Sequence, residues 1–248
     1  MLFRSYRNSS GAYSPDALTD AALKWMDGVK DRPFFLYLPL TSPHTPILPN
    51  PAWRGKSGLN QYGDFVMETD AEVGRLLKAL DDQGLNENTF LVFTSDNGGA
   101  WYTGIKDHNT PYRGYKGTFF EGGIHVPMMM RWPGKIAPGT VRSDVAQHLD
   151  MFATIAAATG ARIPTDRKMD SFNLLGTGPK REVTFWRSGH YRVVRAGDWK
   201  LQVSKRPDKV WLFNLATDPT EQINLAAKDP ERVKAMDALI EKFLTDTH

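Results

Sequence analysis

The chain of 248 residues contains no cysteine. Neither a disulfide bond nor a thiolate metal site can therefore form within it, and thiol usage leaves the redox compartment open. No apolar run is as long as a membrane span, and residues 1–8 lack the apolar core of an export signal. Basic residues outnumber acidic residues by only 31 to 28, with no dense basic block. We therefore expect neither a membrane nor a nucleic acid as partner, whereas a small anionic substrate is compatible with the charge.

The clearest local pattern is a short apolar run at residues 90–93 that ends in polar residues and glycines. The run predicts a buried strand that ends near Ser95, and the acid, amide and two glycines at residues 96–99 predict a turn. Open α/β sheets bind ligands at the carboxyl ends of their strands. Residues 98–123 then predict a long loop, and long loops inside compact domains tend to be functional.

The surrounding residues predict an alternation of strands and helices. Apolar residues at helical spacing indicate helices at residues 15–29, 62–83 and 148–160. Continuous apolar runs indicate a fully covered strand at Pro33–Leu40 and another strand at residues 126–131. Pro127 has no N–H group for a strand ladder, so this second strand starts late or lies at an edge. The alternation favours a mostly parallel sheet.

The residues from Val183 onward have a different pattern. Short apolar runs separated by Gly, Asp, Lys and Pro predict an antiparallel meander. Its clearest strands are expected at residues 191–194, 199–203 and 210–213. Asp229 and Pro230 predict the start of a last helix. Pro, Asp, Gly and Lys cluster between these two parts of the chain, and we place the boundary so that the expected domains are residues 1–165 and 166–248.

Three short motifs follow one another along the chain. They are Ser42-Pro43-His44-Thr45-Pro46, Thr94-Ser95-Asp96-Asn97-Gly98-Gly99 and Lys116-Gly117-Thr118-x-x-Glu121-Gly122-Gly123. Together they resemble the sulfatase family of the alkaline phosphatase superfamily, in an arylsulfatase-like form and over its C-terminal portion only. The resemblance implies a mostly parallel sheet flanked by helices in residues 1–165. It also implies a small C-terminal antiparallel sheet with a helix in residues 166–248, where the stretch Leu212–Leu225 is mainly structural.

The resemblance also implies a site for a sulfate ester. Asp96 and Asn97 match calcium ligands, and oxygen atoms of a carboxylate and an amide suit that hard cation. The alternative for this pair is an Asx turn that bonds nearby backbone amides. Lys116 matches a catalytic lysine that contacts the sulfate, His44 matches a catalytic histidine beside the leaving oxygen, and Arg113 fits the substrate-binding pattern with its role left open. The alternatives for Lys116 and His44 are a solvated surface lysine and an ordinary loop histidine.

Other residues of the motifs have an expected structural role. Glu121, Gly122 and Gly123 form a turn in which small residues are needed and the acid is expected to brace backbone amides. His125 stands where the family more often has arginine. The remaining histidines carry no comparable support in the sequence.

The nucleophile of the family is missing from this sequence. The family uses a formylglycine made from the first residue of a Cys/Ser-x-Pro-x-Arg motif, and the chain contains no such motif. Formylglycine is therefore not expected at a family-type motif in these residues. The family's other pair of metal ligands is also unmatched, so we expect a calcium site that is weak or incomplete, because affinity rises with ligand number and rigidity.

Sulfate ester hydrolysis is the expected function, and several alternatives stay open. A sulfatase-family hydrolase could use an activated water, Ser95 or Thr94 as its nucleophile. Related phosphate, phosphonate or carboxylic esters are alternative substrates. The chain could instead be a non-catalytic remnant, a homo-oligomer, or a subunit that a complementing chain completes. Localisation is unknown, although family members are often exported or periplasmic.

Overall fold

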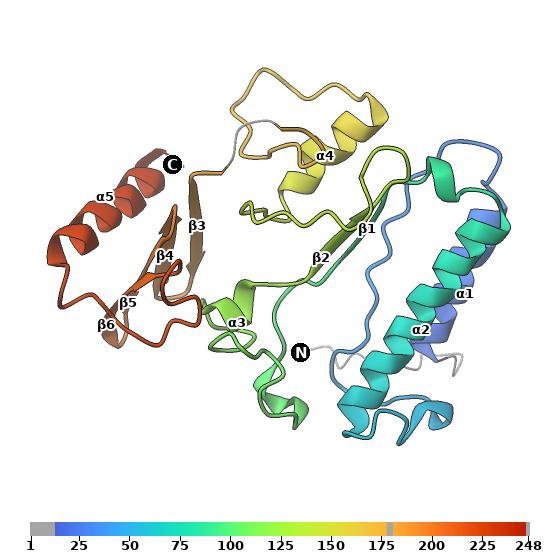
Figure 1. Cartoon of the computed structure of the whole chain (residues 1–248), viewed down its shortest axis with the longest axis horizontal. Coiled ribbons are helices and arrows are strands. Elements are labelled where there is room, and N and C mark those ends of the chain that lie inside the picture. The colour runs from blue at the N-terminus through green and yellow to red at the C-terminus, as the bar shows by residue number, and fades with distance from the viewer. Residues whose placement is uncertain (1–12, 178–180, 247–248) are drawn as a thin grey trace. The chain divides into compact units, whose positions relative to one another are not determined.

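The computed structural model describes residues 13–177 and 181–246 of the chain (Figure 1). Residues 1–8, where no export signal is expected, lie outside this range. Two compact units divide the chain, and each is described by itself. The first comprises the residues up to Leu91 together with 101–108 and 131–135, and the second comprises 92–100, 109–130 and the residues from Ile136 onward. The domain boundary expected after residue 165 stays a prediction.

Two helices in contact with each other, α1 (Ser14–Asp27) and α2 (Gln61–Asp82), dominate the first unit (Figure 1). Both helices confirm the sequence prediction. The side chain of Asn60 accepts hydrogen bonds from the main-chain N–H groups of Tyr62 and Gly63, which caps α2. Short 3₁₀ turns make up the rest of the regular structure: η1 (Pro51–Trp53), η2 (Asn86–Asn88) and η3 (Trp101–Thr103).

The strand predicted at Pro33–Leu40 is wrong. This segment forms no strand, and its side chains are not fully covered, since alternate residues are exposed, with Phe35 at 65% and Tyr37 at 76%. An extended apolar run becomes a strand only when neighbouring strands satisfy its N–H and C=O groups. Among the described residues no strand pairs with this segment.

The first part of the second unit contains a small sheet and two helices. Strand β1 (Leu91–Thr94) pairs with β2 (Met128–Arg131) in a two-stranded sheet. These strands confirm the predicted strand before Ser95 and the late start after Pro127, although the residues of β1 are only partly buried. Helix α3 (Glu121–Ile124) lies in the long loop, and α4 (Asp150–Thr159) ends at Gly160 as predicted. The mostly parallel sheet is not shown, because the sheets of the described residues are this pair and the C-terminal sheet.

The C-terminal part of the second unit is a four-stranded antiparallel sheet with one helix. The strands follow chain order: β3 (Val183–Ser188), β4 (Tyr191–Ala196), β5 (Trp199–Lys205) and β6 (Asp208–Asn214). Helix α5 (Pro230–Asp246) packs against β4 and β5 (Figure 1). Asp229 accepts the main-chain N–H of Arg232 and caps α5. The predicted meander and last helix are thus confirmed.

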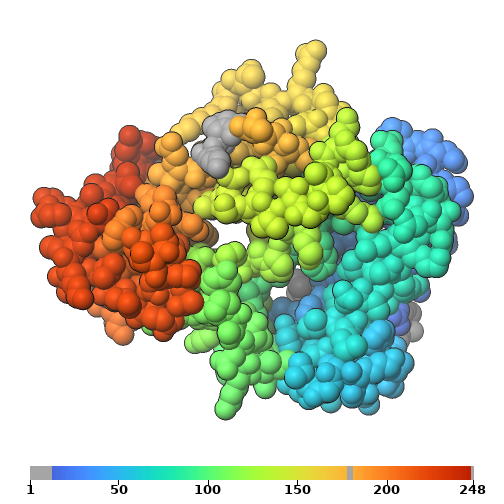
Figure 2. All heavy atoms as spheres, viewed as in Figure 1, coloured from blue at the N-terminus to red at the C-terminus, as the bar shows by residue number. Residues whose placement is uncertain are grey.

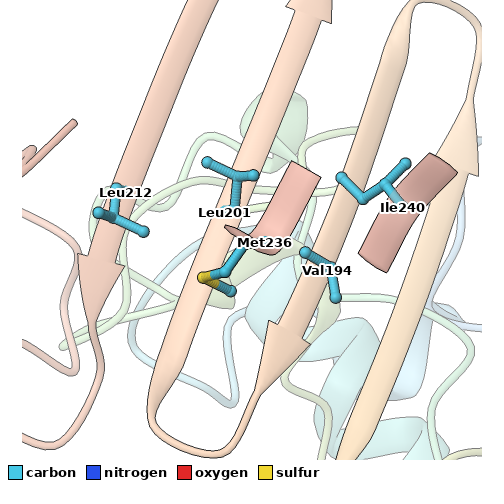
Figure 3. Packing of buried hydrophobic residues seen from close by; sticks show 5 residues of the cluster. All are labelled: Val194, Leu201, Leu212, Met236 and Ile240. Atoms are coloured by element: carbon cyan, nitrogen blue, oxygen red, sulfur yellow. The ribbon is translucent and has the colours of Figure 1, made fainter. Parts of the chain in front are cut away.

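The two faces of this sheet have different neighbours. Leu201 pairs in register with Val194 and Leu212, and these three side chains meet Met236 and Ile240 of α5 in a buried cluster (Figure 3). Burial of such side chains supplies about 1.5–3 kcal/mol each. Because neighbours along a strand face opposite sides, Lys200 and Gln202 lie on the other face.

No helix in the described part of the chain has the length and apolar composition to cross a membrane.

Candidate active site

The carboxyl end of β1 presents the predicted metal ligands of the second unit. Asp96 is exposed, and its carboxylate accepts no hydrogen bond from the residues that the structure describes. The Asn97 amide nitrogen donates to the carbonyl oxygen of Gly98 at 3.0 Å. Among the described residues Asp96 therefore does not form the Asx turn that was the alternative for this pair.

His148 fixes the residue just before Asp96. Its Nε2 atom donates to the carbonyl oxygen of Ser95 at 2.8 Å, and the Ser95 hydroxyl donates to the carbonyl oxygen of Asn97 at 3.0 Å. Thr94 Oγ1 donates to the carbonyl oxygen of Pro127 at 3.0 Å. Each of these bonds holds the backbone of the turn. No pattern in the sequence points to this role of His148.

Three glycines allow the turn after β1 to touch the loop of α3. The main-chain N–H of Gly98 donates to Gly123 at 3.0 Å, and a Cβ atom on Gly98 would lie 1.9 Å from the oxygen of Gly122. A Cβ atom on Gly122 would lie 2.5 Å from the oxygen of Gly114, and one on Gly123 would lie 2.3 Å from that of Thr118. The predicted need for small residues at Gly122 and Gly123 is confirmed.

The backbone of Lys116 joins this same arrangement. Its N–H group donates to the carbonyl oxygen of Gly99 at 3.0 Å, three residues beyond Asp96. The flanking residues Gly114 and Gly117 both have φ of 89°, a left-handed conformation that glycine adopts without a Cβ penalty. The partly buried Lys116 thus follows a backbone path that is tied to the end of β1.

Asn109 is a part of the site that the sequence analysis missed. Its Oδ1 atom accepts the N–H of Gly99 at 2.9 Å, and its Nδ2 atom donates to the oxygens of Gly99 at 3.0 Å and Gly114 at 3.1 Å. One side chain therefore holds both backbone segments, the turn after β1 and the loop that carries Lys116. A single asparagine in a polar loop gives no sequence pattern that could have revealed this.

Arg113 has protein partners in the structure. Its guanidinium donates to the carbonyl oxygen of Glu221 at 2.8 Å and lies 4.1 Å from the ring centroid of Phe120. The main-chain oxygen of Arg113 also accepts the N–H of Gly122 at 2.7 Å. These contacts fix the beginning of the loop, and substrate contact by Arg113 stays a prediction.

Glu121 forms ion pairs where it was expected to brace backbone amides. Its carboxylate lies 2.7 Å from Nζ of Lys200 and 3.3 Å from Nδ1 of His125. Burial alone would raise the pKa of Glu121, but the hydrogen bond from His125 and the charge of Lys200 lower it to about 2. The acid that braces an amide is Glu221, which accepts the N–H of Glu121 at 2.6 Å. Burial raises the pKa of Glu221 in spite of the neighbouring Lys200.

His44 belongs to the first unit, whereas Asp96, Asn97, Arg113 and Lys116 belong to the second. His44 is exposed, its Nδ1 donates to the carbonyl oxygen of Thr45 at 2.8 Å, and its main-chain N–H donates to Thr41 at 3.2 Å. With Nδ1 protonated, Nε2 carries the lone pair in the neutral ring. The structure therefore ties the backbone of the Lys116 loop to the turn that follows Asp96 and Asn97. The roles of the predicted site residues, His44 included, stay predictions.

The oxygen donors at the end of β1 suit calcium in kind but are few in number. Across residues 13–177 and 181–246, no three His, Asp or Glu side chains gather in a way that could hold a metal ion. Calcium binds six to eight oxygen atoms, so Asp96 and Asn97 could form only a part of its shell.

Comparison with known protein families covers both units. The family model described as Sulfatase matches residues 2–161, and the model described as N-sulphoglucosamine sulphohydrolase, C-terminal, matches residues 114–247. Among curated proteins, the N-acetylgalactosamine-6-O-sulfatase of Bacteroides thetaiotaomicron is 32% identical over 93% of this chain and 51% of its own length. Human arylsulfatase A is 34% identical over 92% of this chain and 51% of its own length.

Solved structures give the same result. A structure from work on the metabolism of multiple glycosaminoglycans by Bacteroides thetaiotaomicron superposes with a TM-score of 0.82 at 30% identity, over 93% of this chain and 54% of that one. The crystal structure of Ps i-CgsB in complex with k-i-k-neocarrahexaose superposes with a TM-score of 0.83 at 28% identity, over 93% and 55% of the two chains. The chain thus spans about half the length of the curated relatives it matches, which fits the C-terminal portion of longer members.

Proposed function

Because the chain belongs to the sulfatase family, we propose that it supplies the sulfate- and calcium-binding part of a sulfatase site and that the reaction is hydrolysis of sulfate esters. The observation that carries the proposal is the 3.0 Å hydrogen bond between the N–H of Lys116 and the oxygen of Gly99. It ties the motif that contains the lysine to the motif that contains Asp96. An ammonium group and a carboxylate from these motifs then serve one site.

Lys116 is the proposed sulfate contact. An ammonium group stabilises the negative charge that develops on the sulfate oxygens in the transition state, and a fixed backbone reduces the cost of placing it there. Asp96 and the Asn97 amide oxygen are the proposed calcium ligands. When bound, calcium would draw electron density from the ester oxygens as a Lewis acid.

His44 is the proposed donor to the leaving oxygen. Its Nδ1 atom donates to the carbonyl oxygen of Thr45, and Nε2 is the atom proposed to transfer the proton. An imidazole can donate a proton and take it up again, which suits a general acid. Arg113 is proposed to support the site without contacting the leaving oxygen, because its guanidinium binds the carbonyl oxygen of Glu221 and so holds the start of the loop.

The nucleophile is the part of the chemistry to which the described residues contribute least. The hydroxyl groups of Thr94 and Ser95 both donate to main-chain carbonyl oxygens, of Pro127 and Asn97. A serine or threonine nucleophile instead needs a base to accept its proton. These bonds favour a nucleophile other than Thr94 or Ser95, and formylglycine has no family-type motif in these 248 residues.

Sulfated sugars are the first substrates to test. The bacterial relative is named for the 6-O-sulfate of N-acetylgalactosamine, and one structural neighbour holds a neocarrahexaose. Phosphate, phosphonate and carboxylic esters are the alternative class. They would be supported if the chain hydrolysed p-nitrophenyl phosphate or acetate faster than the sulfate.

The test of the proposed reaction is release of p-nitrophenol from p-nitrophenyl sulfate by the purified chain, with calcium and with EGTA. Lys116→Ala is compared with Lys106→Ala, which removes the same charge from an exposed position of the long loop. Turnover that needs calcium and Lys116 is the expected result. Turnover that both variants retain would contradict the proposal.

A subunit completed by another chain is a second candidate, and one observation favours it. The aromatic side chains of Phe35 and Tyr37 are exposed on an unpaired extended segment, and uncovered apolar strand-like segments tend to pair with other chains. A homo-oligomer or a complex with a complementing chain would cover them. Light scattering of the purified chain gives its molar mass and so tests self-association. The mass of a monomer would contradict the homo-oligomer.

A further inference from the structure

We propose that Lys200 and Glu221, on the C-terminal part of the chain, are positioning residues that hold the Lys116 loop in its anion-binding shape. This inference rests on the proposed function, because it assumes that Lys116 contacts the sulfate. Together with Glu121 the two residues form a buried ion triad, which is the name used below for Glu121, Lys200 and Glu221.

The ion triad is almost completely shielded from solvent. The side chains of Lys200 and Glu221 are 0% exposed, and that of Glu121 is 8% exposed. Nζ of Lys200 lies 2.7 Å from the carboxylate of Glu121 and 2.9 Å from that of Glu221. A buried charge is costly unless it is paired and hydrogen-bonded, so the ammonium group fixes both carboxylates around itself.

Glu221 transmits this position to the backbone of the loop. Its carboxylate accepts the N–H of Glu121 at 2.6 Å, and its carbonyl oxygen accepts the guanidinium of Arg113 at 2.8 Å. Both ends of the segment 113–121, in which Lys116 lies, are therefore attached to one residue. Glu221 itself has φ of 56°. The carboxylate of Asp218 accepts the main-chain N–H groups of Gln222 at 3.0 Å and Ile223 at 2.8 Å, the two residues that follow Glu221.

Aromatic packing reinforces the attachment from the same face of the sheet. The ring of Phe120 lies 6.1 Å from those of Trp211 and Phe213, and the ring of Phe119 lies 5.9 Å from that of Tyr191. In Figure 2 the orange and orange-red atoms of the C-terminal sheet region adjoin the green atoms of this loop. Gln202 adds a weaker bond of 3.4 Å to the oxygen of Phe119.

The energetic role of the ion triad differs from that of the aromatic contacts. Apolar packing of similar volume would stabilise the sheet equally well, because desolvation of buried ions offsets most of their attraction. The ions make the position of the loop more specific, since the charged hydrogen bonds of the carboxylates form only in one arrangement of their partners. The opposite face of the sheet already has its own core around Leu201 and Ile240. Disruption of the ion triad should therefore release the loop before it unfolds the sheet.

The experiment compares variants by hydrogen exchange and by calorimetric titration with inorganic sulfate, both with calcium present. Lys200→Met removes the central charge, Glu221→Gln removes one carboxylate and keeps its size, and Lys200→Arg keeps the charge. Ile240→Val is the control, because it removes one methyl group from the core on the other face of the same sheet. Circular dichroism checks that each variant is folded at the temperature used.

Lys200→Met should raise amide exchange in residues 113–123 at least about tenfold while β3–β6 stay protected, since a buried charge loses its partner. Sulfate affinity should fall by roughly tenfold in the same variant, because an unfixed loop must be ordered on binding. Glu221→Gln should give smaller changes in the same residues, and Lys200→Arg should restore much of both. Ile240→Val should change neither the loop exchange nor the sulfate affinity.

Several results would overturn the inference. One is unchanged exchange of residues 113–123 in Lys200→Met; another is a rise that is equal across β3–β6. If Lys200→Met does not fold, unchanged loop exchange in the folded Glu221→Gln variant overturns it. A wild-type chain that binds no sulfate would instead contradict the proposed function. In that case the exchange data still decide whether Lys200 and Glu221 hold the loop.

Discussion

The Oε2 atom of Glu221 accepts a 2.6 Å hydrogen bond from the main-chain nitrogen of Glu121, 100 residues earlier in the chain. A carboxylate from the stretch Leu212–Leu225 thus supports the motif that contains Lys116. The mainly structural role that the family resemblance implies for the stretch stays a prediction, and the hydrogen bond from Glu121 to Glu221 is consistent with it. The small antiparallel sheet is therefore more than an appended subdomain.

Gly98→Ala should disrupt the site because the new Cβ atom would lie 1.9 Å from the oxygen of Gly122. We expect a lower melting temperature and faster amide exchange in residues 98–99 and 114–123. Gly74→Ala is the matched control: this position lies in α2 and has no atom within 4 Å of the added Cβ. It should stabilise the chain by up to about 1 kcal/mol. Equal melting temperatures for the two variants would contradict the close approach of Gly98 and Gly122.

Glu121→Gln should cost stability in a pH-dependent way. The pKa of Glu121 is lowered from 4.5 to about 2 in the folded chain, so its ionised form stabilises the fold at neutral pH. This contribution, up to roughly 3 kcal/mol, is full above pH 4.5 and is lost as the pH falls toward 2. Urea unfolding at several pH values should therefore give a difference between wild type and variant that shrinks across this window. A difference that grows as the pH falls would reverse the assigned sign.

Asn109→Ala should weaken the link between the turn after β1 and the Lys116 loop. The variant removes three hydrogen bonds, to the N–H and oxygen of Gly99 and to the oxygen of Gly114. We expect a loss of about 1–3 kcal/mol in unfolding free energy, because main-chain groups lose their partner. The exposed Asn88→Ala variant should lose less than about 0.5 kcal/mol. Similar losses in both variants would argue against the role of Asn109.

Asp96→Asn should reduce calcium binding, because a neutral amide replaces the charged ligand of the proposed pair. Calcium should raise the melting temperature of the wild-type chain, EGTA should reverse this shift, and the shift should shrink in the variant. Asp70→Asn changes an exposed acid on α2 in the same way and should leave the shift intact. A calcium shift that Asp96→Asn leaves unchanged would remove the metal role from this residue.

The sequence predicts elements well where one pattern determines them. The helical spacing of apolar residues found α1 and α2, and the turn residues between short apolar runs found the antiparallel meander. Gly160 marked the end of α4 because it adopts a φ of 70°. These features are determined by residues close together in the sequence, so local patterns are sufficient to predict them.

The sequence fails where a residue depends on a distant partner. Pro33–Leu40 has the composition of a covered strand, but strand formation needs a neighbour that no described segment provides. Lys200 looks like an ordinary charged residue in a strand, and its burial against Glu121 and Glu221 follows only from the packing of the loop on the sheet. Asn109 was missed for the same reason, because its partners lie in two separate segments.

Titration of the purified chain with inorganic sulfate, in calcium buffer, tests the central claim most directly. The claim is that Lys116 belongs to an anion site built by the chain's own backbone. The account predicts saturable binding by the wild type and by Lys106→Ala, and a loss of about tenfold or more in Lys116→Ala, since a charge-assisted contact is removed. Equal affinity in Lys116→Ala, or no binding by the wild type, would contradict it.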